Sequence, residues 1–251
     1  MAVEATTDSG TSPSRRGLRR GTLTSEMILA ETLRLLDEDG IEGFSLPKLG
    51  RALGADQTAV YRHFASKDDI VLALADRLIE EALDGLAQQD CWVDTLTDMA
   101  RRLRRTYLAH PAAASISAYR TTQGPAEIRA VDIIIGAMLS AGFEGAEAAL
   151  MYRAVGDFAL SWAGFEASFL ALDERLQQND RTAWTRAYLG VRRAEHPNVW
   201  QLRTELPEVD DDDIAAMILS LFIDGLIRRA PRPCGCAKHQ SVETASGSQT
   251  G

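Results

Sequence analysis

The stretch FSLPKLGRALGADQTAVYRHFASK, from Phe44 to Lys67, decides the fold of the chain around it. Ser45 is suited to cap a helix whose first turn tolerates Pro47, because first-turn N–H groups have no partner within the helix. Gly54 supplies the left-handed position that ends this helix. The apolar face of the helix consists of leucines three and four residues apart, namely Leu46, Leu49 and Leu53. The pattern predicts a short amphipathic helix followed by a tight turn.

A second short helix is predicted from Gln57 to Phe64, with Asp56 as its cap. Val60 and Phe64 share one side and are expected to pack inward. The opposite side carries Thr58, Ala59, Tyr61, Arg62 and His63. Two short helices of this kind form either an ordinary helical hairpin with a solvated face or a helix-turn-helix. In a helix-turn-helix, the second helix presents its N-terminal residues to base edges in the DNA major groove.

The side chains of the second helix suit DNA in different ways. Gln57 can pair with adenine through two hydrogen bonds, and Ala59 or the methyl group of Thr58 can meet a thymine methyl. Arg62 suits either a base or a phosphate. The side chains placed for phosphates, which fix register without reading sequence, are Tyr61, His63 and Lys67. The full predicted DNA-contacting set is Ser45, Lys48, Gln57, Thr58, Ala59, Tyr61, Arg62, His63 and Lys67.

The run TAVYRHFASKDDIVLAL, which begins at Thr58, resembles the recognition helix and following helix of the TetR family of tetracycline-repressor-like regulators. That family shows Tyr, a basic position, His-Phe, a Ser-Lys turn and an acid-led helix. The matching residues here are Tyr61, Arg62, His63, Phe64, Ser66, Lys67, Asp68 and Asp69. Upstream, Leu49 and Ala52 occupy the packing positions, and Ser66 with Asp69 forms a capping pair. The resemblance spans about 60 residues and implies a DNA-binding regulator.

The composition favours an all-α protein. The chain has 251 residues, of which 45% are hydrophobic and 25% charged, enough for one large core or two smaller ones. Apolar repeats at three and four residues recur, while alternating β-branched runs do not stand out. The longest uncharged apolar runs, such as Ile214 to Ile223, are far short of a membrane span, and the N-terminus lacks the apolar core of a signal peptide. Three cysteines, an odd number, argue against a disulfide framework and for a reducing cytoplasm.

The net charge of −9 is unevenly distributed. Residues 1–67 hold nine basic and nine acidic side chains, and the remainder holds 18 basic and 27 acidic ones. The acidity therefore belongs to the second part of the chain. A locally basic face on an acidic body keeps non-specific DNA binding weak and favours one orientation on DNA.

We expect four parts. Residues 1–22 form a disordered basic arm, either a solvated tail or a segment that reaches DNA through Arg15, Arg16, Arg19 and Arg20. Residues 23–68 form a three-helix helix-turn-helix domain. Residues 69–230 form a larger C-terminal helical domain for effector binding and dimerisation, and residues 231–251 form a disordered tail. Cys234, Cys236 and His239 lack a fourth ligand nearby, so neither a metal nor a cofactor is expected.

Two helices of the second part are apolar on more than one side. The helix at about 144–175 carries a stripe at alternating spacings of four and three, namely Met151, Val155, Phe158, Trp162, Phe165 and Phe169. The helix at about 212–229 behaves similarly. Two such helices from each of two chains would make a four-helix homodimer interface, as the resemblance also implies. The arginine run at 101–105 is interpreted as a solvated face paired with the acidic body.

A helical body attached to a DNA-binding domain indicates a switch operated by a small effector. The candidate pocket residues are Tyr119, Arg120, Met151, Tyr152, Asp157, Phe158, Trp162 and Phe165. Phe158 and Trp162 are also suited to a core, and Arg153 with Asp157 is also suited to a surface pair. The segments HPAAASISAYR and RAVGDFALSW resemble the body of the family's namesake, which holds its drug with magnesium bound partly by a histidine. Near the matching stretch no histidine follows His110, so we expect a mainly apolar or aromatic effector and no metal.

These observations favour a cytoplasmic, ligand-responsive homodimeric repressor that binds a palindromic operator in double-stranded DNA. The alternative is a DNA-binding activator or architectural protein without a small-molecule effector. An enzyme is not expected, because we find no metal cluster, no nucleophile–base spacing and no glycine-rich phosphate loop. No membrane partner is expected either.

Overall fold

A computed structural model describes residues 23–87 and 90–234. All regular structure in these residues is helical, which confirms the all-α class. The α-helices are α1 (Ser25–Asp39), α2 (Leu46–Ala52), α3 (Gln57–Tyr61), α4 (Lys67–Leu83), α5 (Trp92–Ala109), α6 (Pro111–Ser117), α7 (Pro125–Ser140), α8 (Gly145–Leu170), α9 (Glu174–Leu189), α10 (Pro197–Gln201) and α11 (Asp211–Arg229). Two 3-10 turns are η1 (Ile41–Gly43) and η2 (Leu206–Glu208). None of these helices is both long and apolar enough to cross a lipid bilayer.

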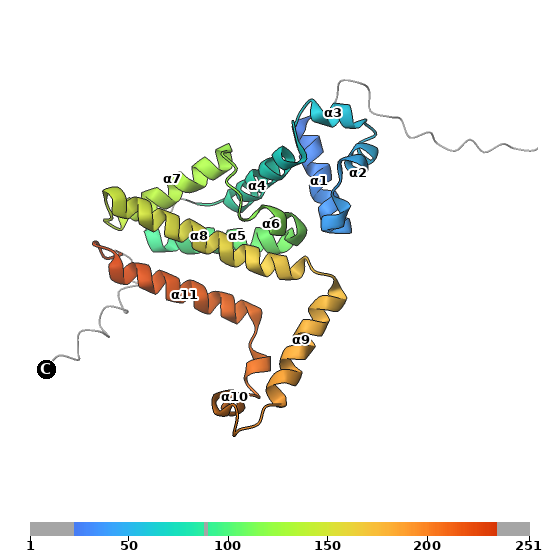
Figure 1. Ribbon diagram of the computed structural model, residues 1–251. Helices are drawn as coiled ribbons and strands as arrows, with labels where there is room; N and C mark the ends of the chain where they lie inside the picture. The colour runs from blue at the N-terminus through green and yellow to red at the C-terminus, as the bar shows by residue number, and fades with distance from the viewer. Residues whose placement is uncertain (1–22, 88–89, 235–251) are drawn as a thin grey trace, which may run out of the picture.

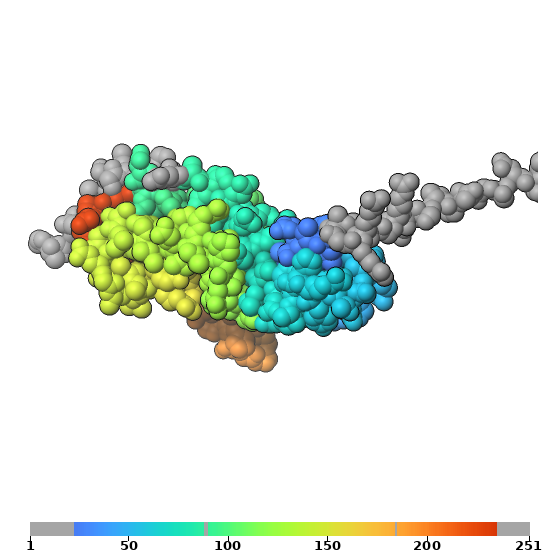
Figure 2. Space-filling model, turned by 90° about the horizontal axis from the view of Figure 1, so that it is seen from above, coloured from blue at the N-terminus to red at the C-terminus, as the bar shows by residue number. Residues whose placement is uncertain are grey.

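The first three α-helices stand at one end of the molecule, and α9 and α10 project from the body (Figures 1 and 2). The predicted caps Ser45 and Asp56 are confirmed, and Thr24 caps α1. Thr24 accepts from the Met27 N–H at 3.2 Å, Ser45 from the Lys48 N–H at 3.4 Å, and Asp56 from the Ala59 N–H at 2.8 Å. The turn before α3 has Gly54 at φ +61°, a conformation that favours glycine. These local interactions set where α2 and α3 begin and how they meet.

Helix α4 links the small helices to the body through one continuous core. Its buried residues include Ile70, Leu74 and Leu78, which belong to the same cluster as Leu49 and Val60 of the small helices. The cluster also includes Tyr107 of α5, three alanines of α6 (112–114), and Ala163 and Ala167 of α8. The predicted boundary at residues 68 and 69 therefore falls within a packed region, so a displacement of α4 is felt on both sides of it.

Two helix ends differ from the sequence prediction. Helix α3 ends at Tyr61 because the next bond, from the His63 N–H to the Val60 carbonyl, already has the tighter three-residue spacing. Helix α4 ends at Leu83, because Asp84 is extended and Gly85 has φ +64°. The predicted helix 144–175 ends at Leu170, and α9 begins at Glu174.

The aromatic stripe of α8 does not form its inner face in the single chain. The buried side of α8 carries mainly small residues, namely Ala148, Ala163, Gly164 and Ala167, together with Val155, the one buried member of the stripe. A Cβ added at Gly164 would lie 2.7 Å from the Cβ of Ala118, so α6 and α8 pack at close range here. Phe165 is 67% exposed, and Phe158 stacks on Phe222 of α11 with ring centroids 4.0 Å apart. The stripe therefore faces α11 and the outside of the chain.

A second core lies at the other end of the body and includes a disulfide that corrects the sequence analysis. The cluster contains Trp92 of α5, Met138 of α7, Ile223 of α11, and Phe143 from the turn between α7 and α8. Cys91 and Cys234 are bonded within it, although they are 143 residues apart. The odd number of cysteines argued against a disulfide framework, but distant cysteines meet here because α11 returns to the N-terminal end of α5.

Candidate DNA interface and effector cavity

The outer face of α3 is open to solvent, and its inner face is fixed. Val60 is 1% exposed and packs in the core of the small helices. The predicted reading residues that the structure leaves exposed are Gln57, Thr58, Tyr61, Arg62 and His63, while Ala59 is half-buried. The structure therefore brings the α3 residues of the predicted set together on one surface at the end of the molecule (Figure 1).

The other members of the predicted set lie on α2 and at the start of α4. Ser45 is the α2 cap, and the half-buried Lys48 donates from Nζ to the Glu42 carbonyl at 3.0 Å. Lys67 donates from Nζ to the Phe44 carbonyl at 2.9 Å, and its ammonium lies 4.5 Å from the centre of the Phe44 ring. The contacts of Lys67 hold the start of α2 against the start of α4. The sequence did not indicate that Lys67 positions these two helices.

The loop after α6 contacts the first turn of α4. Arg120 and Asp68 form a double hydrogen bond of 2.6 and 2.7 Å. The guanidinium of Arg120 holds the pKa of the Asp68 carboxyl below its usual range, and Asp68 raises the pKa of Arg120. Because Asp68 lies close to α3 along the chain, this pair connects the loop to the part of α4 nearest the reading face.

A second contact joins the same loop to the middle of α4. The Asp76 carboxylate accepts from Thr122 Oγ1 at 2.9 Å and from the backbone N–H groups of Glu127 at 2.9 Å and Ala126 at 3.2 Å. Asp76 thus caps α7, whose own N-cap, Gly124, has no side chain to do so. A Cβ at Gly124 would lie 2.2 Å from Asp76 Cγ, so the fit requires glycine there.

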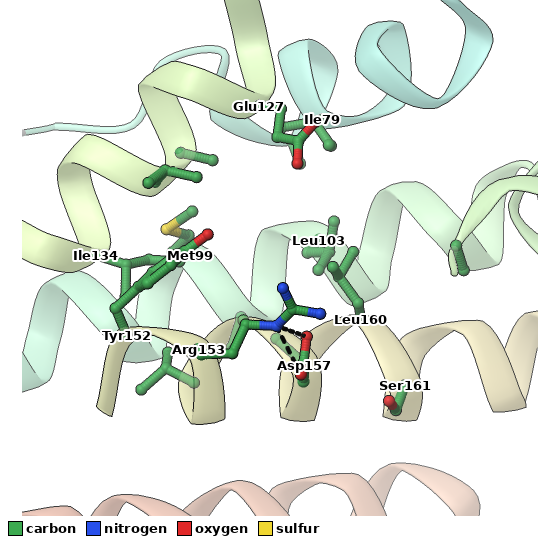
Figure 3. A pocket seen from close by; sticks show the side chains of 18 of the residues that line it. Ile79, Met99, Leu103, Glu127, Ile134, Tyr152, Arg153, Asp157, Leu160 and Ser161 are labelled. Atoms are coloured by element: carbon green, nitrogen blue, oxygen red, sulfur yellow. Dashed lines mark hydrogen bonds and ion pairs between the residues drawn. The ribbon is translucent and has the colours of Figure 1, made fainter. Parts of the chain in front are cut away.

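A cavity of about 380 Å³ lies between α4, α5, α7 and α8 and beside this loop (Figure 3). Its walls are mainly apolar and include Leu96, Met99, Leu103, Val131, Ile134 and Leu160. Polar groups stand at its rim, where Arg153 Nε lies 2.8 Å from both carboxylate oxygens of Asp157 (Figure 3). Glu127 lies across the cavity from this pair. Mainly apolar walls with a few polar groups are typical of small-molecule sites.

The structure divides the predicted pocket residues into two groups. Those that line the cavity are Tyr119, Arg120, Tyr152 and Asp157. Met151 is half-buried against the second core, away from the cavity lining. Phe158, Trp162 and Phe165 line a separate open hollow with Ser161. Met151, Phe158, Trp162 and Phe165 therefore lie outside this cavity, because a stripe shows which residues share a face and not which neighbour the face meets.

The α5 and α7 walls were missed by the sequence analysis. Met99, Leu103 and Ile134 line the cavity but are not among the predicted pocket residues, because nothing in their spacing separates a cavity wall from a filled core. Gly156 also lines the cavity, with no atom within 4 Å of a Cβ added to it. The absence of a side chain there contributes to the open volume.

Two arginines of the run on α5 are paired within the body. Arg104 donates twice to Glu166, at 2.8 Å each, and also lies 2.8 Å from Asp212 of α11. Arg102 pairs with Asp98 at 2.9 Å. Within residues 23–87 and 90–234, no group of three or more His, Cys, Asp or Glu side chains is arranged to hold a metal ion. The arginines of the predicted N-terminal arm, Cys236 and His239 lie outside the described residues.

Two family models match the chain in succession. The model for bacterial regulatory proteins of the tetR family matches residues 28–74, and the model for the tetracyclin repressor-like C-terminal domain matches residues 85–229. An HTH-type transcriptional regulator of Saccharopolyspora erythraea is 28% identical over 185 residues, which cover 74% of this chain and 77% of that protein. An HTH-type transcriptional repressor of Mycobacterium tuberculosis is 28% identical over 152 residues, which cover 58% of each chain.

Solved structures share the fold. ActR of Streptomyces coelicolor in complex with actinorhodin has a TM-score of 0.72 and 22% identity, over 84% of this chain and 99% of that chain. BioQ, solved with its double-stranded DNA operator, has a TM-score of 0.54 and 26% identity, over 59% of this chain and 89% of that chain. These similarities point to regulators and not to an enzyme family.

Proposed function

Because the chain belongs to the tetR family of bacterial regulatory proteins, and is thus a transcriptional regulator, we propose that it is a repressor whose DNA binding is relieved by a small effector. The observation that carries the proposal is α3, a helix capped by Asp56 and anchored by Val60, with its polar side exposed. We propose that it acts in the cytoplasm, where its operator is.

The proposed DNA contacts follow the position of each side chain on α3. Gln57 and Thr58 stand in its first turn, which is the part of a recognition helix that meets base edges. Tyr61, Arg62 and His63 follow at its end and suit the phosphates that flank those bases. BioQ, which shares part of this fold, was solved on its operator, and the M. tuberculosis relative is a repressor.

We propose a homodimer that binds a palindromic operator. The outer sides of α8 and α11 expose large apolar side chains, namely Leu150, Phe165, Met217 and Leu221. Adjacent exposed apolar groups of this size mark interaction surfaces. If two copies join these helices about a two-fold axis, the two α3 helices face DNA with the same symmetry, and the operator half-sites are inverted repeats.

We propose that the effector occupies the cavity between α4, α5, α7 and α8. The largely apolar walls suit an apolar or aromatic molecule, and the Arg153–Asp157 pair offers it polar contacts at the rim. The complex of ActR with actinorhodin shows a relative of this fold with a small molecule bound. Tyr119 and Arg120 line the cavity, and Arg120 also binds Asp68 of α4. Filling the cavity is therefore expected to displace the loop and α4 together, and α3 with them.

The test fills the cavity from within. Gly156→Leu places a side chain in open space on the cavity wall, whereas Gly136→Leu, on the exposed side of α7, is the matched control. Both variants are expected to bind operator DNA like the wild type, because one leucine side chain fills only part of the cavity of about 380 Å³ and leaves the loop in place. For a compound that releases the wild type and the control from DNA, the concentration needed to release Gly156→Leu should be at least about tenfold higher. The reason is that one buried side chain contributes about 1.5–3 kcal/mol. If no compound releases the wild type, the effector-free alternative is favoured. Equal release of Gly156→Leu would place the effector elsewhere.

A further inference from the structure

The Cys91–Cys234 bond lies where two distant parts of the chain meet. Cys91 is the N-cap of α5 and is 4% exposed, and Cys234 follows α11 and is 6% exposed. Their Cα atoms are 6.4 Å apart. Both side chains belong to the apolar cluster around Trp92 and Phe143, so no solvent-exposed cross-link is involved.

The bond lies at the end of α11, whose inner side packs in the second core through Ile223 and Leu226. Near the N-terminal end of α11, Asp212 pairs with Arg104 of α5 at 2.8 Å. In its middle, Phe222 stacks on Phe158 of α8. After its C-terminal end, the Arg232 N–H donates to the Ala141 carbonyl at 2.9 Å, and the disulfide follows two residues later.

The outward side of α11 stays open between these points of attachment. Met217 is 61% exposed and Leu221 is 60% exposed. Figure 1 shows α11 running alongside α8. The disulfide therefore adds a covalent restraint to the C-terminal end of α11, beside the packing of Ile223 and Leu226 in the second core.

We propose that Cys91 and Cys234 are a reversible oxidation site, and that their bond fixes the C-terminal end of α11 to α5. The reversibility of the bond rests on the proposed function. A regulator in the cytoplasm works where thiols are kept reduced, and disulfides there are transient or redox-sensing. The dithiol is then the resting form, and the disulfide forms when an oxidant is present.

The oxidant class is a hydroperoxide. One thiolate attacks the terminal peroxide oxygen, the O–O bond breaks, and an alcohol or water leaves as the sulfur becomes a sulfenic acid. The second thiol then displaces water from that sulfur and forms the Sγ–Sγ bond. The two sulfurs lose two electrons in total, which the peroxide accepts. A small dithiol reverses the reaction by thiol–disulfide exchange.

The first experiment identifies the bond without any need for DNA. The full chain carries Cys236→Ala, so that only Cys91 and Cys234 can pair, and it is treated with hydrogen peroxide or with dithiothreitol. The oxidised protein should be lighter by two hydrogen atoms and yield one disulfide-linked peptide pair. Two thiols that remain free after peroxide treatment, or that are oxidised only to sulfinic acids, would overturn the proposal.

The second experiment measures the restraint on α11. Hydrogen exchange of the segment 223–234 should become at least about tenfold faster when the disulfide is reduced, because the tether no longer limits local opening. Cys234→Ala and Cys91→Ala, both with Cys236→Ala, should show the fast exchange with or without peroxide. Equal exchange rates of the oxidised and reduced parent would contradict the proposal. Since neither measurement uses an operator, a failure here is separate from a failure to bind DNA.

Discussion

Asp76 on α4 offers a sharp test of how the body is joined to the helix that carries the reading domain. Its carboxylate accepts two backbone N–H groups of α7 and the hydroxyl of Thr122. Asp76→Asn keeps the size of the side chain but replaces one acceptor oxygen with a donor. At least one N–H group, of Ala126 or Glu127, then loses its acceptor in a half-buried site.

The expected cost follows from two contributions. An unpaired buried donor costs about 1–3 kcal/mol. Losing the negative charge at the N-terminus of α7 adds about 0.3–1 kcal/mol. Because Asp76 is half-buried, we expect a net loss of about 2 kcal/mol in the free energy of unfolding.

The assay is urea-induced unfolding followed by circular dichroism, with Asp132→Asn as the matched control. Asp132 lies exposed on α7, and its substitution should change the free energy of unfolding by less than about 0.5 kcal/mol. If Asp76→Asn is as stable as the control, Asp76 does not cap α7, and the proposed connection between the cavity loop and α4 loses its main support.

Further predictions concern DNA affinity and helix packing. Gln57→Ala should weaken operator binding by about 1–3 kcal/mol and relax the preference at one or two base pairs, as measured by fluorescence anisotropy on single-substitution operators. In the same assay, Lys67→Ala should weaken all sequences alike and lower the salt slope by about 1, and a change confined to one base pair would contradict this. Gly136→Ala should raise the free energy of unfolding by about 0.5–1 kcal/mol, because the added Cβ meets nothing and the helix gains a better helix former. Gly164→Ala should instead lower it by about 1–3 kcal/mol, because its Cβ would overlap that of Ala118. Equal shifts for the two glycines would refute the packing described for α8.

The small helices could be predicted closely because their signals are local. Thr24, Ser45, Asp56 and Ser66 each cap a helix within three residues of themselves. Gly54 takes the left-handed conformation that its position in the turn requires. Such interactions depend on neighbouring residues in the chain, which a single sequence displays directly.

The body was harder to predict because its decisive contacts are distant in sequence. Asp76 meets Thr122 and Arg104 meets Glu166 across many residues, and no spacing rule indicates either pair. The stripe on α8 was recognised, but Phe158 of the stripe faces α11, whereas Gly164, on another side of α8, packs on α6. Which helices enclose a cavity depends on this choice of face, so the walls from α5 and α7 were missed.

The central claim is that α3 reads DNA as part of a two-fold dimer, and selection of bound duplexes from a random DNA pool tests it most directly. Purified wild-type protein, unfolded and refolded to remove any bound molecule, is mixed with the pool at low salt, and the retained duplexes are sequenced. The account predicts enrichment of one inverted repeat whose half-sites lie about one helical turn apart, or a multiple of it. It also predicts that Gln57→Ala loses the preference at one or two positions in each half-site. No enriched sequence, or an enriched sequence that Gln57→Ala selects unchanged, would contradict it.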